Sequence, residues 1–218
     1  MGPPTIDELR IADDAGAWEA LGFAIDGDTC LLGRVSVRFD GEDADRGIVG
    51  WSLRELASTE LDGLPTTLSE REKPAPAGEH PNGVVAIDHV VAMSPAFERS
   101  VAALRDAGLD LRRIREEPTP AGAPRQAFFR LGEEILELVQ EPEEIVARAG
   151  GPTRPAHFWG LALLVGDLDA TVARMAPHAG EPRPAVQAGR RIATVRRSAG
   201  LAVPLALMSA DEREQAEA

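Results

Sequence analysis

The sequence predicts an α+β fold of repeated βαβββ modules, two of which pair into one curved, U-shaped mixed sheet. The first observation is an order of strand, amphipathic helix and three strands in residues 84–142, which residues 156–209 repeat and residues 5–56 repeat more faintly. The second is the spacing, because a long link of residues 57–83 precedes the second copy and a short one, residues 142–155, follows it. Short connections favour neighbours in space, so the second and third copies are expected to share the sheet.

The second copy shows the order most clearly. Residues 84–93 are a β-branched apolar run typical of a buried strand. We expect a helix with Ser94 as its N-cap and Pro95 at its first position, ending at Gly108. Its apolar face comprises three residues at helical spacing: Phe97, Val101 and Leu104. The strands that follow are predicted at residues 109–114, 126–131 and 134–140, the last two as a hairpin.

The other two copies follow the same order. In the third copy we predict strands at residues 158–165, 191–196 and 201–208 and a helix at residues 167–175. In the first copy we predict strands at residues 6–12, 23–26, 29–39 and 48–53 and a helix at residues 14–21. The chain then divides into an N-terminal half-domain (1–56), a linker (57–83), a two-module domain (84–210) and a charged tail (211–218) that is expected to fray.

Composition excludes several classes of protein. The net charge of −13 repels a phosphate backbone, so nucleic acid is not an expected partner. The acidity has two interpretations, solubility or attraction of a cationic ligand. A single cysteine, Cys30, excludes an internal disulfide framework and is interpreted as a buried hydrophobic residue. With neither a signal peptide nor an apolar run long enough to span a bilayer, the expected location is the cytoplasm, and no membrane association is expected.

The second copy also carries a family resemblance. Its segments IDHVVAMSPAFERSVAALRDAGL and FFRLGEEILELVQEP resemble the vicinal-oxygen-chelate superfamily, which includes glyoxalase I, bleomycin-resistance proteins, methylmalonyl-CoA epimerase and extradiol dioxygenases. The resemblance is good over residues 84–142, fair over 156–209 and weak over 5–56. It implies a cup-shaped sheet that holds a small-molecule ligand, often around a divalent metal.

The resemblance also implies two metal ligands. In metal-using relatives a histidine on the first strand and a glutamate on the last bind the ion, and His89 in IDHVV and Glu137 in ILELV match these positions. Imidazole and carboxylate together suit iron, manganese, nickel or zinc. In the third copy, Gly160 and Ala206 occupy the matching positions, so two ligands remain where three are usual.

The interpretation of His89 and Glu137 stays open. A metal shared across a dimer could recruit His157. Alternatively, His89 is a hydrogen-bonded strand residue inherited from a metal-binding ancestor. Alternation places Glu137 on one face of its strand and Leu136 on the other. If the face of Glu137 lines the cup, Glu137 is a functional candidate, and if it faces solvent, Glu137 is only the polar member of a half-exposed strand.

Four further residues are candidates for ligand binding. The aromatic candidates are Phe129 and Trp159, which are interpreted either as pocket lining or as core. The basic candidates are Arg125 and Arg191, which would bind a carboxylate or phosphate on a ligand or else be solvated surface residues.

Three functions follow from these expectations. The first is a glyoxalase-like protein that binds a small organic molecule without catalysis. The second is a divalent-metal-dependent lyase, isomerase or dioxygenase of the same superfamily. The third is an interaction module without a ligand. Because residues 5–56 bury too little surface to be stable alone, we expect them to pack on the paired domain or to join two chains in a homodimer.

Overall fold

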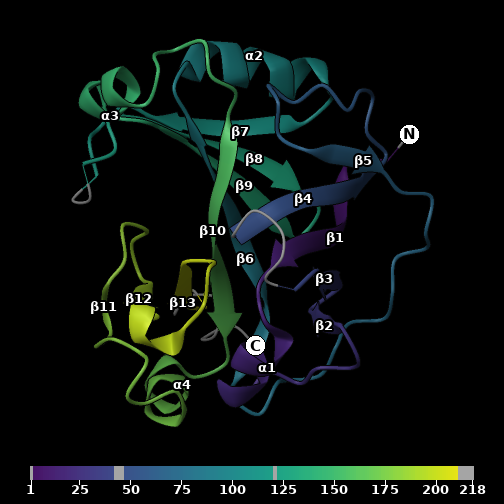
Figure 1. Ribbon diagram of the computed structural model, residues 1–218, viewed down its shortest axis with the longest axis vertical. Coiled ribbons are helices and arrows are strands. Elements are labelled where there is room, and N and C mark those ends of the chain that lie inside the picture. Colours follow the sequence, from purple (N-terminus) through teal and green to yellow (C-terminus); the bar gives the residue numbers. More distant parts are fainter. Residues whose placement is uncertain (1, 42–46, 120–121, 211–218) are drawn as a thin grey trace. The chain divides into compact units, whose positions relative to one another are not determined.

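The computed structural model describes residues 2–41, 47–119 and 122–210, and the expected tail at 211–218 lies outside the described residues. Figure 1 shows the elements. The strands are β1 (Thr5–Ala12), β2 (Thr29–Leu32), β3 (Val35–Phe39), β4 (Gly47–Arg54), β5 (Thr66–Leu68), β6 (Val84–Ser94), β7 (Asp110–Arg115), β8 (Gln126–Leu131), β9 (Glu134–Gln140), β10 (His157–Val165), β11 (Arg183–Pro184), β12 (Arg191–Thr194) and β13 (Leu205–Ser209). The α-helices are α1 (Ala15–Ala20), α2 (Phe97–Asp106), α3 (Glu143–Arg148) and α4 (Leu168–Arg174).

The second and third copies form one mixed sheet of eight strands in the order β11-β12-β13-β10-β6-β9-β8-β7. In each copy the first strand pairs in parallel with the last, β6 with β9 and β10 with β13. The third strand of each copy then pairs antiparallel with the last, and the second with the third. This arrangement confirms the α+β class, the βαβββ modules and the shared sheet.

The first copy forms a separate sheet of five strands in the order β2-β3-β1-β4-β5. Here β1 lies between β3 and β4, so the strand order differs from that of the other two copies. The strand predicted at 23–26 is wrong, because these residues are irregular except for a bridge between Asp26 and Thr29. The long strand predicted at 29–39 is instead the β2–β3 hairpin, which turns at Gly33 with φ of +62°.

Two compact units make up the chain. Unit 1 comprises Met1–Glu8, Gly50–Glu72 and His89–Trp159, and unit 2 comprises Leu9–Val49, Lys73–Asp88 and Gly160–Ala218. Unit 1 therefore holds most of the second copy, unit 2 holds most of the third, and each takes part of the first. The division follows different boundaries from the predicted half-domain, linker and two-module domain.

In unit 1 the helix α2 contacts β9 and buries the predicted apolar face. The N-cap prediction for this helix is wrong by two residues. Ser94 is the last residue of β6, and the helix has Ala96 at its N-cap without a side-chain hydrogen bond. The Ser94 Oγ atom accepts the Ala96 N–H at 3.0 Å, so the hydroxyl closes the turn between strand and helix instead. The helix ends as predicted before Gly108, which has φ of +96°.

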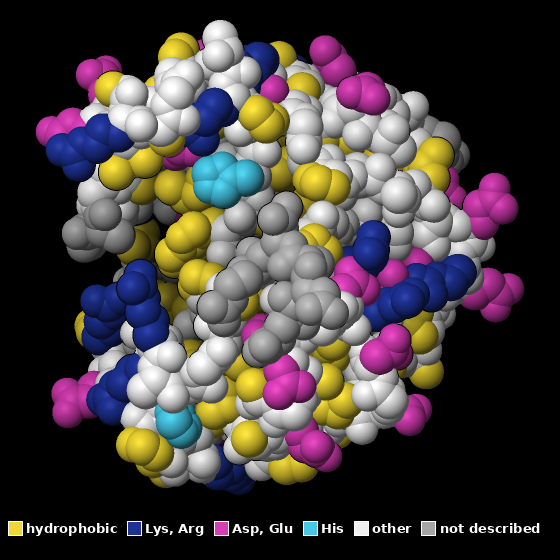
Figure 2. Space-filling view, viewed as in Figure 1, with side chains coloured by type: hydrophobic (Ala, Val, Ile, Leu, Met, Phe, Trp, Pro, Cys, Tyr) yellow, Lys and Arg dark blue, Asp and Glu magenta, His cyan; other side chains and the backbone are white. Residues whose placement is uncertain are grey.

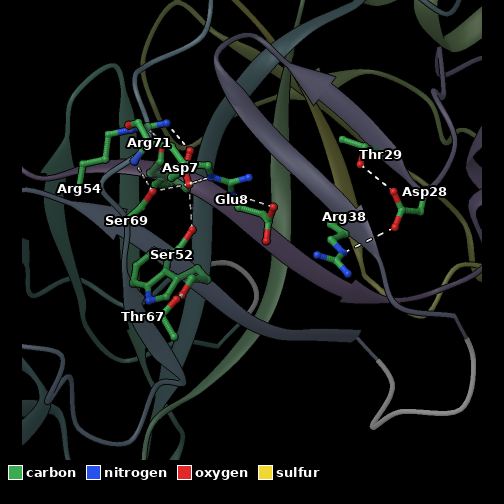
Figure 3. Close-up of polar contacts among 12 residues, drawn as sticks. Asp7, Glu8, Asp28, Thr29, Arg38, Ser52, Arg54, Thr67, Ser69 and Arg71 are labelled. Atoms are coloured by element: carbon green, nitrogen blue, oxygen red, sulfur yellow. Dashed lines mark hydrogen bonds and ion pairs between the residues drawn. The ribbon is translucent and has the colours of Figure 1, made fainter.

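A buried cluster around Asp7 ties part of the linker to β1 and β4 in unit 1 (Figure 3). The Asp7 carboxylate accepts hydrogen bonds from Arg54, from Ser69 Oγ at 2.6 Å and from Arg71 Nε at 2.7 Å. Burial alone would raise the pKa of the Asp7 carboxyl. The hydrogen bonds from Ser69 and Arg71 and the charges of Arg54 and Arg71 outweigh burial, so the pKa is lower than its usual 3.8.

In unit 2 the segment before β6 is anchored by His80 and Asn82. The His80 Nδ1 atom accepts the Ala24 N–H at 3.0 Å, and Nε2 lies 3.1 Å from the Leu31 carbonyl oxygen. The Asn82 side-chain amide donates to the Leu21 carbonyl at 3.0 Å. Nearby on β2, Cys30 is fully buried, and burial raises the pKa of its thiol to about 12, as suits a core residue.

Charged side chains of both signs are interspersed over the face of the described residues that Figure 2 shows. Exposed ion pairs occur among the described residues, such as the 3.1 Å pair of Arg112 Nη1 with Asp110 Oδ2. In the described part of the chain, the helices are all too short or too polar to cross a membrane.

Candidate functional site

Two buried polar residues meet on one face of the sheet in unit 1. His89 lies on β6 and Glu137 on β9, and the His89 Nε2 atom is 3.1 Å from Glu137 Oε2. The parallel register explains the meeting, because Glu137 is opposite Val91, two residues after His89. Residues two apart on a strand share a face, so His89, Val91 and Glu137 point to the same side. The alternative in which Glu137 is only the polar member of a solvent-facing strand does not hold, since Glu137 is 8% exposed.

A third polar residue completes the group. Gln126 is the first residue of β8, and its Nε2 donates a hydrogen bond to Glu137 Oε1. In the antiparallel register Phe128 is opposite Glu137, so Gln126, two residues earlier, lies on the same face as Glu137. We call His89, Gln126 and Glu137 the polar triad. All three residues are buried, with exposed fractions of 9%, 8% and 8% for the whole residues.

The hydrogen-bonding pattern of the triad leaves one acceptor over. A carboxylate only accepts, so the Gln126 amide must direct its NH₂ group at Glu137 and its oxygen away. That oxygen, Gln126 Oε1, is buried and has no hydrogen-bond partner among the described residues. Buried polar atoms in native proteins nearly always have a partner, from the protein, from water or from a ligand. The triad is therefore an arrangement with one acceptor to satisfy.

The third module cannot supply a matching pair. Ala206 on β13 is opposite Ala162 on β10, two residues after Gly160, just as Glu137 is opposite Val91, two residues after His89. Gly160 and Ala206 therefore hold the positions that match His89 and Glu137. A Cβ atom at Gly160 would lie 2.5 Å from the carbonyl oxygen of Pro204, a distance that side chains do not adopt. The glycine is therefore required by the backbone, and a histidine ligand there is sterically excluded.

The triad fits one edge of a metal site but not a complete one. Two ligands at about 2.1 Å from one ion and about 90° apart are roughly 3.0 Å from each other, close to the separation of His89 Nε2 and Glu137 Oε2. The described residues, however, contain no group of three or more His, Cys, Asp or Glu that could hold an ion. The His157 ring, considered as a further ligand, has its Nδ1 3.6 Å from Glu141 Oε1. The described residues thus fall short of a metal centre, which usually needs three ligands.

The four ligand-binding candidates differ in their burial and in their partners. Phe129 is fully buried and follows Phe128, so it lies on the face of β8 opposite to Glu137. Its burial supports the core interpretation. Trp159 on β10 is 52% exposed. Arg125 Nη1 lies 2.6 Å from Glu98 Oε1, and in unit 2 Arg191 pairs with Asp169 on α4 at 2.7 Å, so both guanidinium groups already have acidic partners.

Sequence reasoning missed Gln126. Gln126 follows a proline-rich turn and is the first residue of the predicted strand, where a polar side chain is ordinary. Its signal was available, since the predicted hairpin of residues 126–131 and 134–140 already fixes which residues of the two strands share a face.

Comparisons with known proteins agree with this fold. Residues 86–192 match the family model of the Glyoxalase/Bleomycin resistance protein/Dioxygenase superfamily. A crystal structure of methylmalonyl-CoA epimerase from Mycobacterium tuberculosis is similar at 19% identity and a TM-score of 0.50, over 64% of this chain and 95% of that one. A xylose isomerase-like TIM barrel/4-hydroxyphenylpyruvate dioxygenase fusion protein is similar at 13% identity and a TM-score of 0.64, over 95% of this chain and 49% of that one.

The solved structures are only 19% and 13% identical to this chain. At such identities the solved structures share the fold with this chain, which spans about half the length of the fusion protein. No curated protein sequence gives a significant match.

Proposed function

We propose that residues 86–192, which match the family model of the glyoxalase/bleomycin resistance protein/dioxygenase superfamily, bind a small organic molecule at the polar triad without catalysis. The observation that carries the proposal is the triad itself, three polar side chains about nine-tenths buried on one sheet face. Burying a carboxylate, an imidazole and an amide costs stability unless each is well partnered. A fold that retains them with an acceptor unsatisfied is consistent with a binding site.

The chemistry of the triad indicates what kind of molecule fits. Glu137 and the oxygen of Gln126 both accept hydrogen bonds, so a bound group beside them should donate one. The negative charge of a carboxylate disfavours an anionic group at the same position. The ligand class that satisfies both conditions is a neutral or cationic molecule with a hydroxyl or N–H group.

A ligand screen tests this function. The full-length protein would be screened by saturation-transfer NMR against small hydroxylated compounds and small amines, with anionic carboxylates as the comparison set. We expect hits among the donors that weaken at least tenfold in His89→Ala, while His178→Ala leaves them unchanged. Hits that bind equally to the His89→Ala variant would place the ligand elsewhere and refute the proposal.

A second candidate function is a divalent-metal-dependent lyase, isomerase or dioxygenase. It is favoured by the 3.1 Å separation of His89 Nε2 and Glu137 Oε2, which suits two ligands of one ion. Iron, manganese, nickel and zinc are the metals that this donor pair suits. Elemental analysis of protein purified without chelators separates the two functions. Stoichiometric metal that is lost in Glu137→Gln supports the second function, and metal-free protein that still binds a ligand supports the first.

Assembly is a further part of the proposal. We propose a homodimer in which residues 5–56 form the interface. The strand β2 is at one end of the first sheet, so one side of its backbone has no strand beside it in the described part of the chain. Such edges pair readily with a second copy. Sedimentation velocity at low and high salt tests this assembly, and a monomer under both conditions would exclude it.

A further inference from the structure

We propose that Gln126 is a positioning residue, which holds the Glu137 carboxylate so that only Oε2 is available beside His89. The inference rests on the proposed function, because it concerns the same triad. It gives a role to a residue that sequence reasoning does not single out.

The first step is the division of the two carboxylate oxygens. Oε2 lies 3.1 Å from His89 Nε2, and Oε1 accepts the hydrogen bond from Gln126 Nε2. Each oxygen of Glu137 therefore has a different partner. A carboxylate held at both oxygens cannot rotate freely, so it keeps Oε2 on the side of His89.

The second step is where the partners stand along β9. His89 is opposite Ile135, two residues before Glu137, and Gln126 is opposite Val139, two residues after it. The two partners thus reach the carboxylate along diagonals from opposite directions. Diagonal neighbours in a sheet have Cβ atoms about 7–8 Å apart, so only long side chains can meet across them. Asparagine at position 126, one methylene shorter, would not reach Glu137.

The third step is why the holding group is an amide. A second carboxylate at position 126 would repel Glu137, and a lysine or arginine would neutralise its charge. The Gln126 amide donates a hydrogen bond while leaving the negative charge of Glu137 in place. The bound group then meets one imidazole nitrogen and one anionic oxygen in a fixed geometry, which is the arrangement that selects among ligands.

The test uses NMR on the full-length protein without any ligand. In the wild type, one Nε2 proton of Gln126 should be shifted downfield and should exchange with water roughly tenfold more slowly than a free amide. Glu137→Met, which removes the acceptor oxygen, should abolish this signature. Gln126→Met and Gln126→Asn should change the ¹⁵N signals of the His89 ring, because a released carboxylate no longer holds the ring in one orientation.

The matched control is Gln140→Met, the same substitution at a half-buried glutamine at the end of β9 outside the triad, which should leave the His89 signals unchanged. Folded Gln126→Met and Gln126→Asn variants with wild-type His89 signals would overturn the inference. If Gln126→Met does not fold, the asparagine variant and the wild-type amide signature still decide. Loss of ligand binding in the screen with the signature intact refutes the proposed function and leaves the positioning role standing.

Discussion

His89 on β6 and Glu137 on β9 are joined by a 3.1 Å contact between Nε2 and Oε2 inside unit 1, where each side chain is only 11% exposed. The contact depends on the parallel register of the two strands, which brings a residue from the start of the module to one from its end. Here the family resemblance and the geometry single out the same two residues.

Replacing His89 by alanine should lower the free energy of unfolding by roughly 1–3 kcal/mol, because Glu137 then keeps only its bond from Gln126 in a buried position. Urea denaturation at pH 7 measures the change. His178→Ala is the control, since His178 is half-buried and makes only a 3.4 Å contact with Ser198 Oγ. An equal effect of the two substitutions would mean that the His89–Glu137 contact contributes nothing specific.

Replacing Gly160 by alanine should destabilise the protein by roughly 1–3 kcal/mol, because the added Cβ would lie 2.5 Å from the Pro204 carbonyl oxygen and force the backbone apart. Gly166→Ala is the matched control, since a Cβ at Gly166 meets no atom within 4 Å and its backbone is not left-handed. Thermal unfolding compares the two variants. If Gly160→Ala is as stable as Gly166→Ala, a histidine in the third module is not sterically excluded.

The sequence predicts regular elements well where alternation and turn residues agree. The β8–β9 hairpin has the predicted bounds, 126–131 and 134–140, because Gly132 takes the left-handed conformation that the turn needs. The break at Gly33 was missed, since one glycine in an apolar run is also compatible with a continuous strand.

The candidate site was only partly predictable. His89 and Glu137 stand out as polar residues in apolar strands. Gln126 stands at a strand end, where a polar residue is ordinary, and only the register with β9 reveals its role. Arg125 and Arg191 are each held by a tertiary ion pair, with Glu98 and with Asp169, which local patterns do not encode.

Replacing Asp7 by asparagine should lower the free energy of unfolding at pH 7 by about 2–4 kcal/mol and flatten its fall below about pH 4. The pKa of Asp7 is lower in the folded than in the unfolded chain, since the hydrogen bonds of Ser69 and Arg71 outweigh burial. Its stabilisation is therefore complete above the unfolded value of 3.8 and is lost as the pH falls through that value toward the folded one.

Urea denaturation between pH 6 and pH 3 measures the Asp7 effect. Asp110→Asn is the control, since it removes a carboxylate from an exposed ion pair with Arg112. A wild-type protein and an Asp7→Asn variant with parallel pH profiles would show that Asp7 does not contribute to acid sensitivity.

Acidification between pH 7 and pH 5 should weaken unit 2 through His80. Burial lowers the pKa of His80 from 6.5, only partly offset by the bond with the Leu31 carbonyl oxygen. The geometry gives the reason, because Nδ1 accepts the Ala24 N–H and would clash with it if protonated. The unfolded chain therefore takes up a proton below pH 6.5 that the folded chain resists, and the free energy of unfolding falls as the pH drops through this range.

His80→Gln should be about 1–2 kcal/mol less stable than wild type at pH 7.5 and should lack this part of the pH dependence. Amide hydrogen exchange at Ala24, followed from pH 7.5 to pH 5, reports the local opening, with His178→Gln as the control. Protection of Ala24 that stays constant over this range in the wild type would show that His80 does not act as the acid-sensitive anchor.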